Sequence, residues 1–251
     1  MDQPLPRNVK LTIEYDGTAY HGWQRQANTA TVQQVLEDGI AEIVGHPVTL
    51  HASGRTDAGV HALGQIANFH TDSTIPAERL HHAINTVVSM DIAVLRAEDV
   101  PDGFHARYSA AGKTYRYAIV CRPVRPAVGA PYVHWLRREP DLPAMQAAAG
   151  HLVGEHDFAA FETESGGGNT VRTVTRAEWV QEGQRLYFWV AADGFLYNMV
   201  RAMVGTLLEV GLGKRSHDDI PRLLAARDRA RAGPTAPAKG LCLMRVEYRD
   251  T

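Results

Sequence analysis

The N-terminal part of the chain contains several short stretches in which β-forming residues cluster or hydrophobic and polar residues alternate. Residues 9–15 (VKLTIEY) show the clearest alternation. A period of two is typical of a strand with one buried face. Strands are predicted at residues 9–15, 48–53, 65–70 and 92–97.

Two helices are predicted between these strands. Thr31 and Gln34 have the spacing of a capping box. The apolar residues of the first helix recur on one face at Val32, Val35, Leu36, Ile40 and Ile43. Gly45 and Pro47 end this helix. The second helix opens at Pro76, so the order of elements is β-α-β-β-α-β.

The C-terminal part repeats this order. Strands are predicted at residues 114–121, 174–180, 186–192 and 241–248, and helices at residues 142–152, 197–210 and 219–227. Two such units predict an α+β protein made of two tandem RRM-like or ferredoxin-like halves with mainly antiparallel sheets. We divide them at residues 1–107 and 108–251 and expect a central cleft between them, the usual place for a ligand.

The composition is that of an ordinary soluble globular protein, with 45% hydrophobic and 22% charged residues in 251. No apolar run approaches the roughly 18–20 residues needed to span a bilayer, and the start of the chain lacks the apolar region of a signal peptide. Cys121 and Cys242 form no CxxC pair and lie in strand-like stretches. They indicate buried, inert thiols and a cytoplasmic protein.

Charge is distributed unevenly along the chain. The net charge of −2 argues by itself against a nucleic-acid partner, yet residues 1–107 carry −6 and residues 108–251 carry +4. Residues 107–138 contain no acid and seven cations, namely Arg107, Lys113, Arg116, Arg122, Arg125, Arg137 and Arg138. A local patch of this kind can bind a polyanion whatever the net charge.

Three polar, glycine-punctuated segments are candidates for function, and the first is residues 16–26 (DGTAYHGWQRQ). Tyr20, His21 and Trp23 offer stacking surfaces and Arg25 reaches phosphates, a combination that suits RNA. The alternative is a loop whose aromatic residues anchor it to the body of the protein.

The second segment, residues 53–65 (SGRTDAGVHALGQ), lies between two predicted strands. Arg55 and Asp57 point the same way if the segment is extended. A carboxylate beside a guanidinium stays ionised at neutral pH, as a nucleophile or base requires. The alternative is a turn with an Asx bond and a surface ion pair. A metal site using Asp57, His61 and also His51 lacks a recurrent ligand spacing, so no metal is expected here.

The third segment, residues 104–117 (FHARYSAAGKTYRY), lies where the two halves meet in the sequence. On a strand, Tyr115 and Tyr117 share one face and Arg116 occupies the other. Tyr115 either stacks on a base or belongs to the core.

Taken together, GRTDAGVHALGQ, EYDGTAYHGWQRQ, FHARYSAAGKTYRY, NTVRTV and FLYNMVRAMVGTLLEVG resemble the tRNA pseudouridine synthase A family. The resemblance spans roughly residues 9–248 in order. It implies a cytoplasmic, homodimeric isomerase that converts uridine to pseudouridine at positions 38, 39 and 40 of the tRNA anticodon stem-loop. By position, Asp57 matches the catalytic aspartate and Tyr115 the tyrosine that packs on the target base. Arg55 matches the arginine that holds the nucleotide out of the stack, and Arg201 a residue expected to pair with the catalytic carboxylate.

The reaction breaks the C1′–N1 bond and joins C1′ to C5 with no net redox change, so no cofactor is expected. Asp57 attacks C6, attacks C1′ or removes the 2′ proton, and the sequence does not separate these routes. The dimer interface is sought on the apolar helix from Tyr197 or around Trp135. The alternative function is a non-catalytic RNA-binding module or RNA chaperone built from tandem RRM-like halves. It would not explain a carboxylate in a glycine-rich loop, because a carboxylate repels phosphate.

Overall fold

The computed structural model describes residues 6–163 and 168–249. The chain forms two compact units, the first built from residues 6–111 and 243–249 and the second from residues 112–242. The final strand of the chain is therefore divided, and most of it groups with the first unit. Residues 164–168 (ESGGG) form a glycine-rich insert in the sequence, and all but Gly168 lie outside the described residues.

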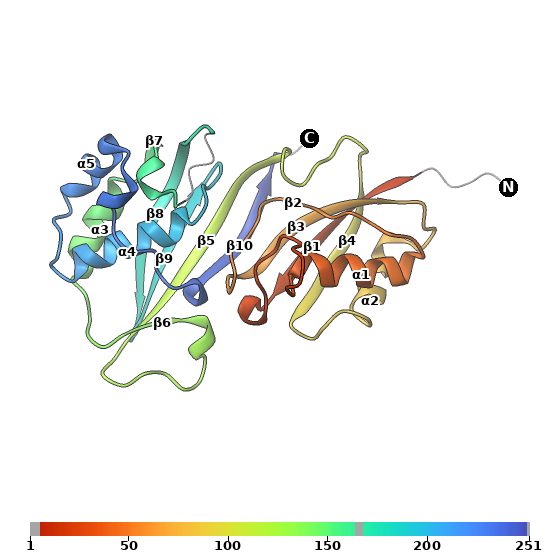
Figure 1. The fold of residues 1–251 in the computed structure, drawn as a ribbon, viewed down its shortest axis with the longest axis horizontal. Coiled ribbons are helices and arrows are strands. Elements are labelled where there is room, and N and C mark those ends of the chain that lie inside the picture. The colour runs from red at the N-terminus through yellow and green to blue at the C-terminus, as the bar shows by residue number, and fades with distance from the viewer. Residues whose placement is uncertain (1–5, 164–167, 250–251) are drawn as a thin grey trace. The chain divides into compact units, whose positions relative to one another are not determined.

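The first unit contains a sheet with the strand order β4-β1-β3-β10, and β2 pairs with β3. Its elements are β1 (Arg7–Tyr15), α1 (Val32–Val44), β2 (His51–Ala52), β3 (His61–Thr71), α2 (Ala77–Ile84), β4 (Ile92–Val100) and β10 (Leu241–Tyr248). β1 pairs antiparallel with both β3 and β4. The two helices contact each other and lie side by side in Figure 1. The predicted succession of strands and helices up to residue 100 is confirmed.

The second unit contains a sheet with the strand order β5-β9-β8-β7, in which neighbours are antiparallel, and β6 pairs parallel with β5. Its elements are β5 (Ala110–Cys121), β6 (His134–Leu136), α3 (Leu142–Gly150), β7 (Gly154–Asp157), β8 (Val171–Glu182), β9 (Arg185–Ala192), α4 (Met199–Gly211) and α5 (Asp219–Ala226). The α+β class with mainly antiparallel strands is confirmed. β6 and β7 were not predicted, and the tandem RRM-like description stays a prediction.

Helix α1 follows directly from its sequence. The Thr31 hydroxyl accepts a hydrogen bond from the Gln34 N–H, and Gly45 ends the helix with a φ of 84°, a left-handed conformation that favours glycine. Val32, Leu36 and Ile40 are fully buried, as the periodicity predicts. The packing of α1 against the sheet thus fixes the end of the segment that precedes the helix, residues 16–31, within the first unit.

Helix α4 begins two residues later than predicted. Asn198 precedes it with a φ of 58°, and a left-handed residue cannot continue a right-handed helix. Tyr197 is 47% exposed, whereas most of α4 is buried, including Met199, Val204 and Leu207. The apolar character of residues 197–210 therefore reflects the core of the second unit, which leaves α4 little surface for a partner subunit.

The two cysteines are buried, as predicted, and neither takes part in a disulfide. Burial raises the pKa of the Cys121 thiol to about 11, so the thiolate is scarce at neutral pH. Among the described residues, no helix is long and apolar enough to cross a membrane.

Candidate functional site

The loop that carries Asp57 is fixed at its start by buried polar contacts with β3. Ser53 is fully buried, and its hydroxyl donates to Gln65 Oε1 at 2.7 Å. The Gln65 amide donates in turn to Gly54 O at 2.9 Å, and the Ser53 N–H donates to Ile66 O at 2.7 Å. Buried hydrogen bonds of this kind are costly to break, so they hold the loop in one place.

Thr56 anchors the middle of the loop. Its hydroxyl hydrogen-bonds Tyr15 OH at 2.8 Å, and its carbonyl accepts from the Trp23 N–H at 3.0 Å. Thr56 is buried, whereas Arg55 is exposed and Asp57 is half-buried. The two candidate side chains therefore flank an inward-pointing residue, as an extended segment predicts.

Asp57 lies at the start of a tight turn. The Val60 N–H donates to Asp57 O at 3.1 Å, and Gly59 has a φ of 77°. Arg55 makes no hydrogen bond or ion pair with another described residue, so its guanidinium is available to bind a phosphate. A half-buried carboxylate on a fixed loop beside an accessible arginine can act on a substrate bound through its phosphates.

In residues 16–26, the anchoring alternative holds for the two large aromatic residues. Trp23 is 1% exposed, so its ring is not available to stack on a base, and Tyr20 is held in place through its hydroxyl group, which bonds to Ser89 and Asp91. Tyr20 OH donates to Asp91 Oδ1 at 2.6 Å. Arg25 NH1 lies 3.0 Å from Glu37 Oε2 and 3.2 Å from Asp38 Oδ1. The segment therefore supports the Asp57 loop, and His21 remains its exposed aromatic ring.

Tyr115 and Tyr117 point to the same side of β5 and differ in their surroundings. Tyr117 is fully buried and donates to Pro237 O at 2.8 Å. Tyr115 is 7% exposed, and its ring meets the edge of Phe195 at a centroid distance of 5.1 Å. Phe195 is half-buried, so Tyr115 lies near the surface of the core. Arg116 lies on the other face, over the rings of Tyr187 and Trp189, as predicted.

Arg201 lies in the first turn of α4. Its Nε donates to Ala236 O at 2.8 Å, and its NH1 donates to Asn198 Oδ1. The Asn198 amide also donates to Thr163 Oγ1 at 2.8 Å. Asn198, whose backbone is left-handed, thus marks the start of α4, and its side chain also orients the guanidinium of Arg201.

The acid-free segment at residues 107–138 combines internal and exposed cations. Arg122 donates to Val124 O and Arg125 O, and Arg116 stacks on aromatic rings, so both serve the fold. Four of the seven predicted cations are exposed, namely Arg107, Arg125, Arg137 and Arg138. These four are the members of the segment that can reach a polyanion.

The structure places the predicted site residues in two groups. Arg55 and Asp57 belong to the first unit, and Tyr115 and Arg201 belong to the second. Sequence reasoning missed the residues that hold them, above all Gln65, Thr56 and Asn198. A cavity of about 210 Å³ in the second unit, lined by Cys121, Glu139 and Gln184 among others, contains none of the site residues.

The chain matches a known family of RNA-modifying isomerases. The sequence pattern of the family described as tRNA pseudouridine synthase matches residues 11–109 and 148–249. A protein of Acetivibrio thermocellus called tRNA pseudouridine synthase A is 48% identical over 243 residues, which cover 96% of this chain and 100% of that protein. A protein of the same name from Citrifermentans bemidjiense is 48% identical over 246 residues, 97% of this chain and 98% of that protein.

A solved structure titled Crystal Structure of a Cbf5-Nop10-Gar1 Complex aligns over 95% of this chain and 50% of that chain, with 14% identity and a TM-score of 0.41. That score is too low to support a conclusion. The sequence matches define the class of protein, an isomerase that forms pseudouridine in tRNA. The chain belongs to the tRNA pseudouridine synthase family. The enzyme interpretation is thereby confirmed over the non-catalytic RNA-binding module.

Proposed function

We propose that this enzyme isomerises uridine to pseudouridine at positions 38, 39 and 40 of the tRNA anticodon stem-loop, with Asp57 as the catalytic residue. The observation that carries this proposal is the position of Asp57, half-buried on a loop that Ser53, Thr56 and Gln65 hold in place. A pre-positioned carboxylate needs little reorganisation when the substrate binds.

The bond changes require one acidic group and no redox partner. The C1′–N1 bond breaks, the uracil turns, and C1′ joins C5; the hydrogen at C5 leaves as a proton and N1 takes up a proton, so the product is an isomer of the substrate. Asp57 supplies either a nucleophile, at C6 or C1′, or a base for the 2′ proton. Each route begins from the carboxylate of Asp57; we propose that Arg201 pairs with this group and that Arg55 binds the RNA.

The remaining site residues act on the target nucleotide. The base must leave the stack before it reacts, which costs a few kcal/mol, and less at the edge of a loop than inside a stem. Arg55, which is exposed, holds the displaced nucleotide through its phosphate. Tyr115 packs on the base, and its edge contact with Phe195 fixes the ring for that purpose. Arg201 is the residue that we propose to pair with the carboxylate of Asp57.

The test of Asp57 is tritium release from tRNA that carries uridine labelled at C5. Asp57→Asn is expected to release no tritium while it binds tRNA as the wild type does. The matched control is Asp102→Asn, which changes an acid of the same unit with a 91% exposed side chain and should retain full activity. Appreciable turnover by Asp57→Asn would end the proposal for this residue.

The positions modified are tested with tRNA transcripts that keep a single uridine at position 38, 39 or 40. Mapping pseudouridine by reverse transcription after carbodiimide treatment should show product at each of the three. Product elsewhere in the tRNA, and none in the anticodon stem-loop, would show that the family function holds and that the site assignment is wrong.

Tyr115→Phe should retain tRNA binding, since the ring that packs on the base is preserved.

We also propose that the enzyme is a homodimer and that residues 122–136 contribute to its interface. Of the two candidates, α4 is largely buried within its own unit, whereas Val124, Val128 and Tyr132 are 71%, 93% and 50% exposed. Exposed apolar residues so close in sequence favour a covered surface. In sedimentation experiments Val128→Asp should shift the protein toward monomer, and Met90→Asp, at a fully exposed position in the first unit, should not. A monomeric wild type would refute the dimer.

A further inference from the structure

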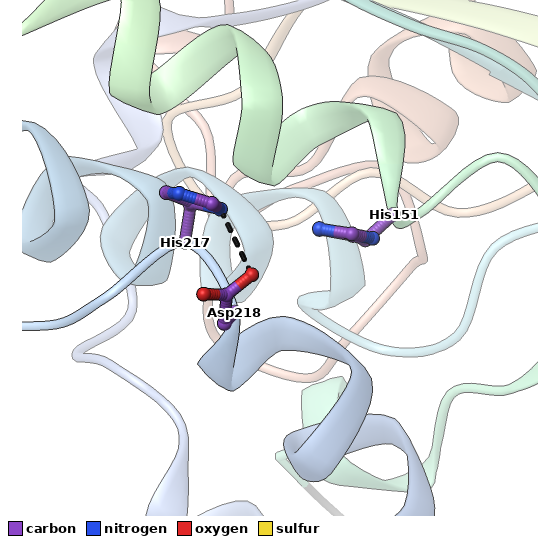
Figure 2. A group of neighbouring side chains, drawn as sticks. All are labelled: His151, His217 and Asp218. Carbon is purple, nitrogen blue, oxygen red and sulfur yellow. Dashed lines mark ion pairs between the residues drawn. The ribbon is translucent and has the colours of Figure 1, made fainter.

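The second unit contains a cluster of metal-ligating side chains that pseudouridine formation does not use. His151, His217 and Asp218 each offer a ligand atom, and these atoms lie within 4.8 Å of one another. Figure 2 shows a ring nitrogen of each histidine turned toward the other ring, with the carboxylate of Asp218 next to His217. We propose that these three residues bind a divalent transition-metal ion of the Zn²⁺ type.

The distances fit such an ion. In a tetrahedral zinc site with bonds of about 2.0–2.1 Å, neighbouring ligand atoms lie roughly 3.3 Å apart. His217 Nδ1 and Asp218 Oδ1 are already 3.2 Å apart, so one edge of the tetrahedron is formed. His151 is exposed, and its ligand atom lies within 4.8 Å of the other two, so a third ligand is within reach of the same ion.

A second observation concerns the direction of the His217 ring. Its Nδ1 is buried and has no hydrogen-bond partner among the described residues, although the carboxylate oxygen of Asp218 is 3.2 Å away. The two atoms are close, yet they are not aligned as donor and acceptor. As ligands of one ion, His217 Nδ1 and Asp218 Oδ1 would both face the ion and not each other, which fits a close pair without a hydrogen bond.

The positions of the residues in the fold also favour a cation. His151 is the C-cap of α3, where the carbonyl groups of the helix end create a negative potential. Asp218 is the N-cap of α5, and its side chain makes no capping hydrogen bond, so the carboxylate remains available as a ligand. The rings of His151 and His217 are nearly parallel, with an interplanar angle of 8°. A bound ion would connect the end of α3 to the start of α5.

The donor set selects the kind of ion. Two imidazoles and one carboxylate suit zinc and its neighbours in the first transition row, whereas Mg²⁺ and Ca²⁺ prefer oxygen ligands alone. Water would complete the four ligands. Because the cluster lies outside the proposed catalytic residues, binding is measured on the protein without tRNA and is independent of whether Asp57 is catalytic.

The experiment is calorimetric titration of the tag-free, chelator-treated protein with ZnCl₂ at pH 7.5, with MgCl₂ as a second titrant. One equivalent of zinc should bind at micromolar or lower concentration, and magnesium should not bind. Each of His151→Gln, His217→Gln and Asp218→Asn should weaken binding at least about tenfold, since even the loss of outer-shell partners weakens metal sites by that factor. Asn is as good an N-cap as Asp, so Asp218→Asn removes the charged ligand without unfolding α5.

The matched control is His82→Gln, because His81 and His82 form another close histidine pair, with ring centroids 3.9 Å apart. This variant should bind zinc as the wild type does. Zinc present at 100 times its dissociation constant should also favour the folded state about 100-fold in wild type and much less in His217→Gln. Zinc binding weaker than about 100 μM, or equal loss in His82→Gln, or no loss in the three cluster variants, would overturn the proposal.

Discussion

The variant Gly22→Ala should separate two effects of a substitution: a change in the position of the loop that carries Asp57 and a change in the stability of the protein. Gly22 has a φ of 88°, and a Cβ there would lie 2.5 Å from Thr56 O and 3.1 Å from Asp57 C. Gly45 is the matched control, since it has a φ of 84° and a Cβ there would meet nothing within 4 Å. Both variants force alanine into the left-handed region, which costs about 1–2 kcal/mol. Gly22→Ala alone pushes against the loop.

The size of the effect follows from the geometry. Relief of the 2.5 Å contact to an ordinary 3.4 Å separation moves the backbone of the loop by 0.9 Å. A displacement of about 1 Å at a reacting group lowers the rate by about 100-fold. We therefore expect Gly45→Ala to lose about 1–2 kcal/mol of stability and no activity. Gly22→Ala should lose at least as much stability and, in addition, about 100-fold in kcat.

Urea titration followed by circular dichroism measures the free energy of unfolding, and tritium release at 20 °C measures kcat on the folded protein. Binding of tRNA should change little in either variant, because neither residue is proposed to contact phosphate. If Gly22→Ala kept the kcat of Gly45→Ala while it remained folded, the reasoning would fail. Either the loop would not position the reacting group, or the reacting group would not lie on this loop.

Three further outcomes follow from single contacts. Burial and the hydrogen bond to Asp91 raise the pKa of Tyr20 from 10.0 to about 12. The contribution of Tyr20 to stability should therefore be constant below about pH 10 and be lost as the pH rises toward 12, and urea titrations of Tyr20→Phe should show a smaller fall in stability over this range. In the same titrations, the free energy of unfolding should fall by about 1.5–3 kcal/mol in Glu37→Gln and by under about 1 kcal/mol in Asp38→Asn. Glu37 and Asp38 both contact Arg25, but the Glu37 side chain is 8% exposed and the Asp38 side chain is 61% exposed. Equal losses of stability in the two variants would contradict the argument. The affinity of the wild type for tRNA should fall steeply as the salt concentration rises. Arg137→Gln should reduce the slope of log K against log salt by about 1. A flat plot for the wild type would show that the basic segment at residues 107–138 does not contact tRNA.

The sequence predicts elements well where local chemistry and periodicity agree. Helix α1 has a side-chain cap at Thr31, an apolar stripe and a glycine stop, and all three are present in the structure. Strand β10 has the predicted bounds, Leu241–Tyr248. The start of α4 was predicted two residues early, because nothing in the hydrophobic pattern reveals that Asn198 is left-handed. β7, four residues long, gives too short a pattern to detect.

Long-range polar contacts lie beyond what a single sequence predicts. Gln33 and Glu37 lie on α1 outside the predicted apolar stripe, yet both are buried. Glu37 Oε1 accepts from the Gln33 amide at 2.8 Å and from the Leu50 N–H at 3.0 Å, and its other oxygen pairs with Arg25. A buried carboxylate is tolerated only when such donors surround it. Those donors come from three separate segments, so only the folded chain reveals them.

The same reasoning connects the two motifs that were separate candidates in the sequence. Trp23 and Tyr20 were candidates for RNA stacking, but the Trp23 N–H donates to Thr56 O and the Gly59 N–H donates to Tyr20 O. Gly22 leaves room for the Thr56 carbonyl where any side chain would collide with it. Residues 16–26 are therefore part of the support for Asp57, and their glycine and aromatic residues are required by packing. The proposed reaction uses the single carboxylate of Asp57, and its rate should depend on how firmly these contacts hold that carboxylate.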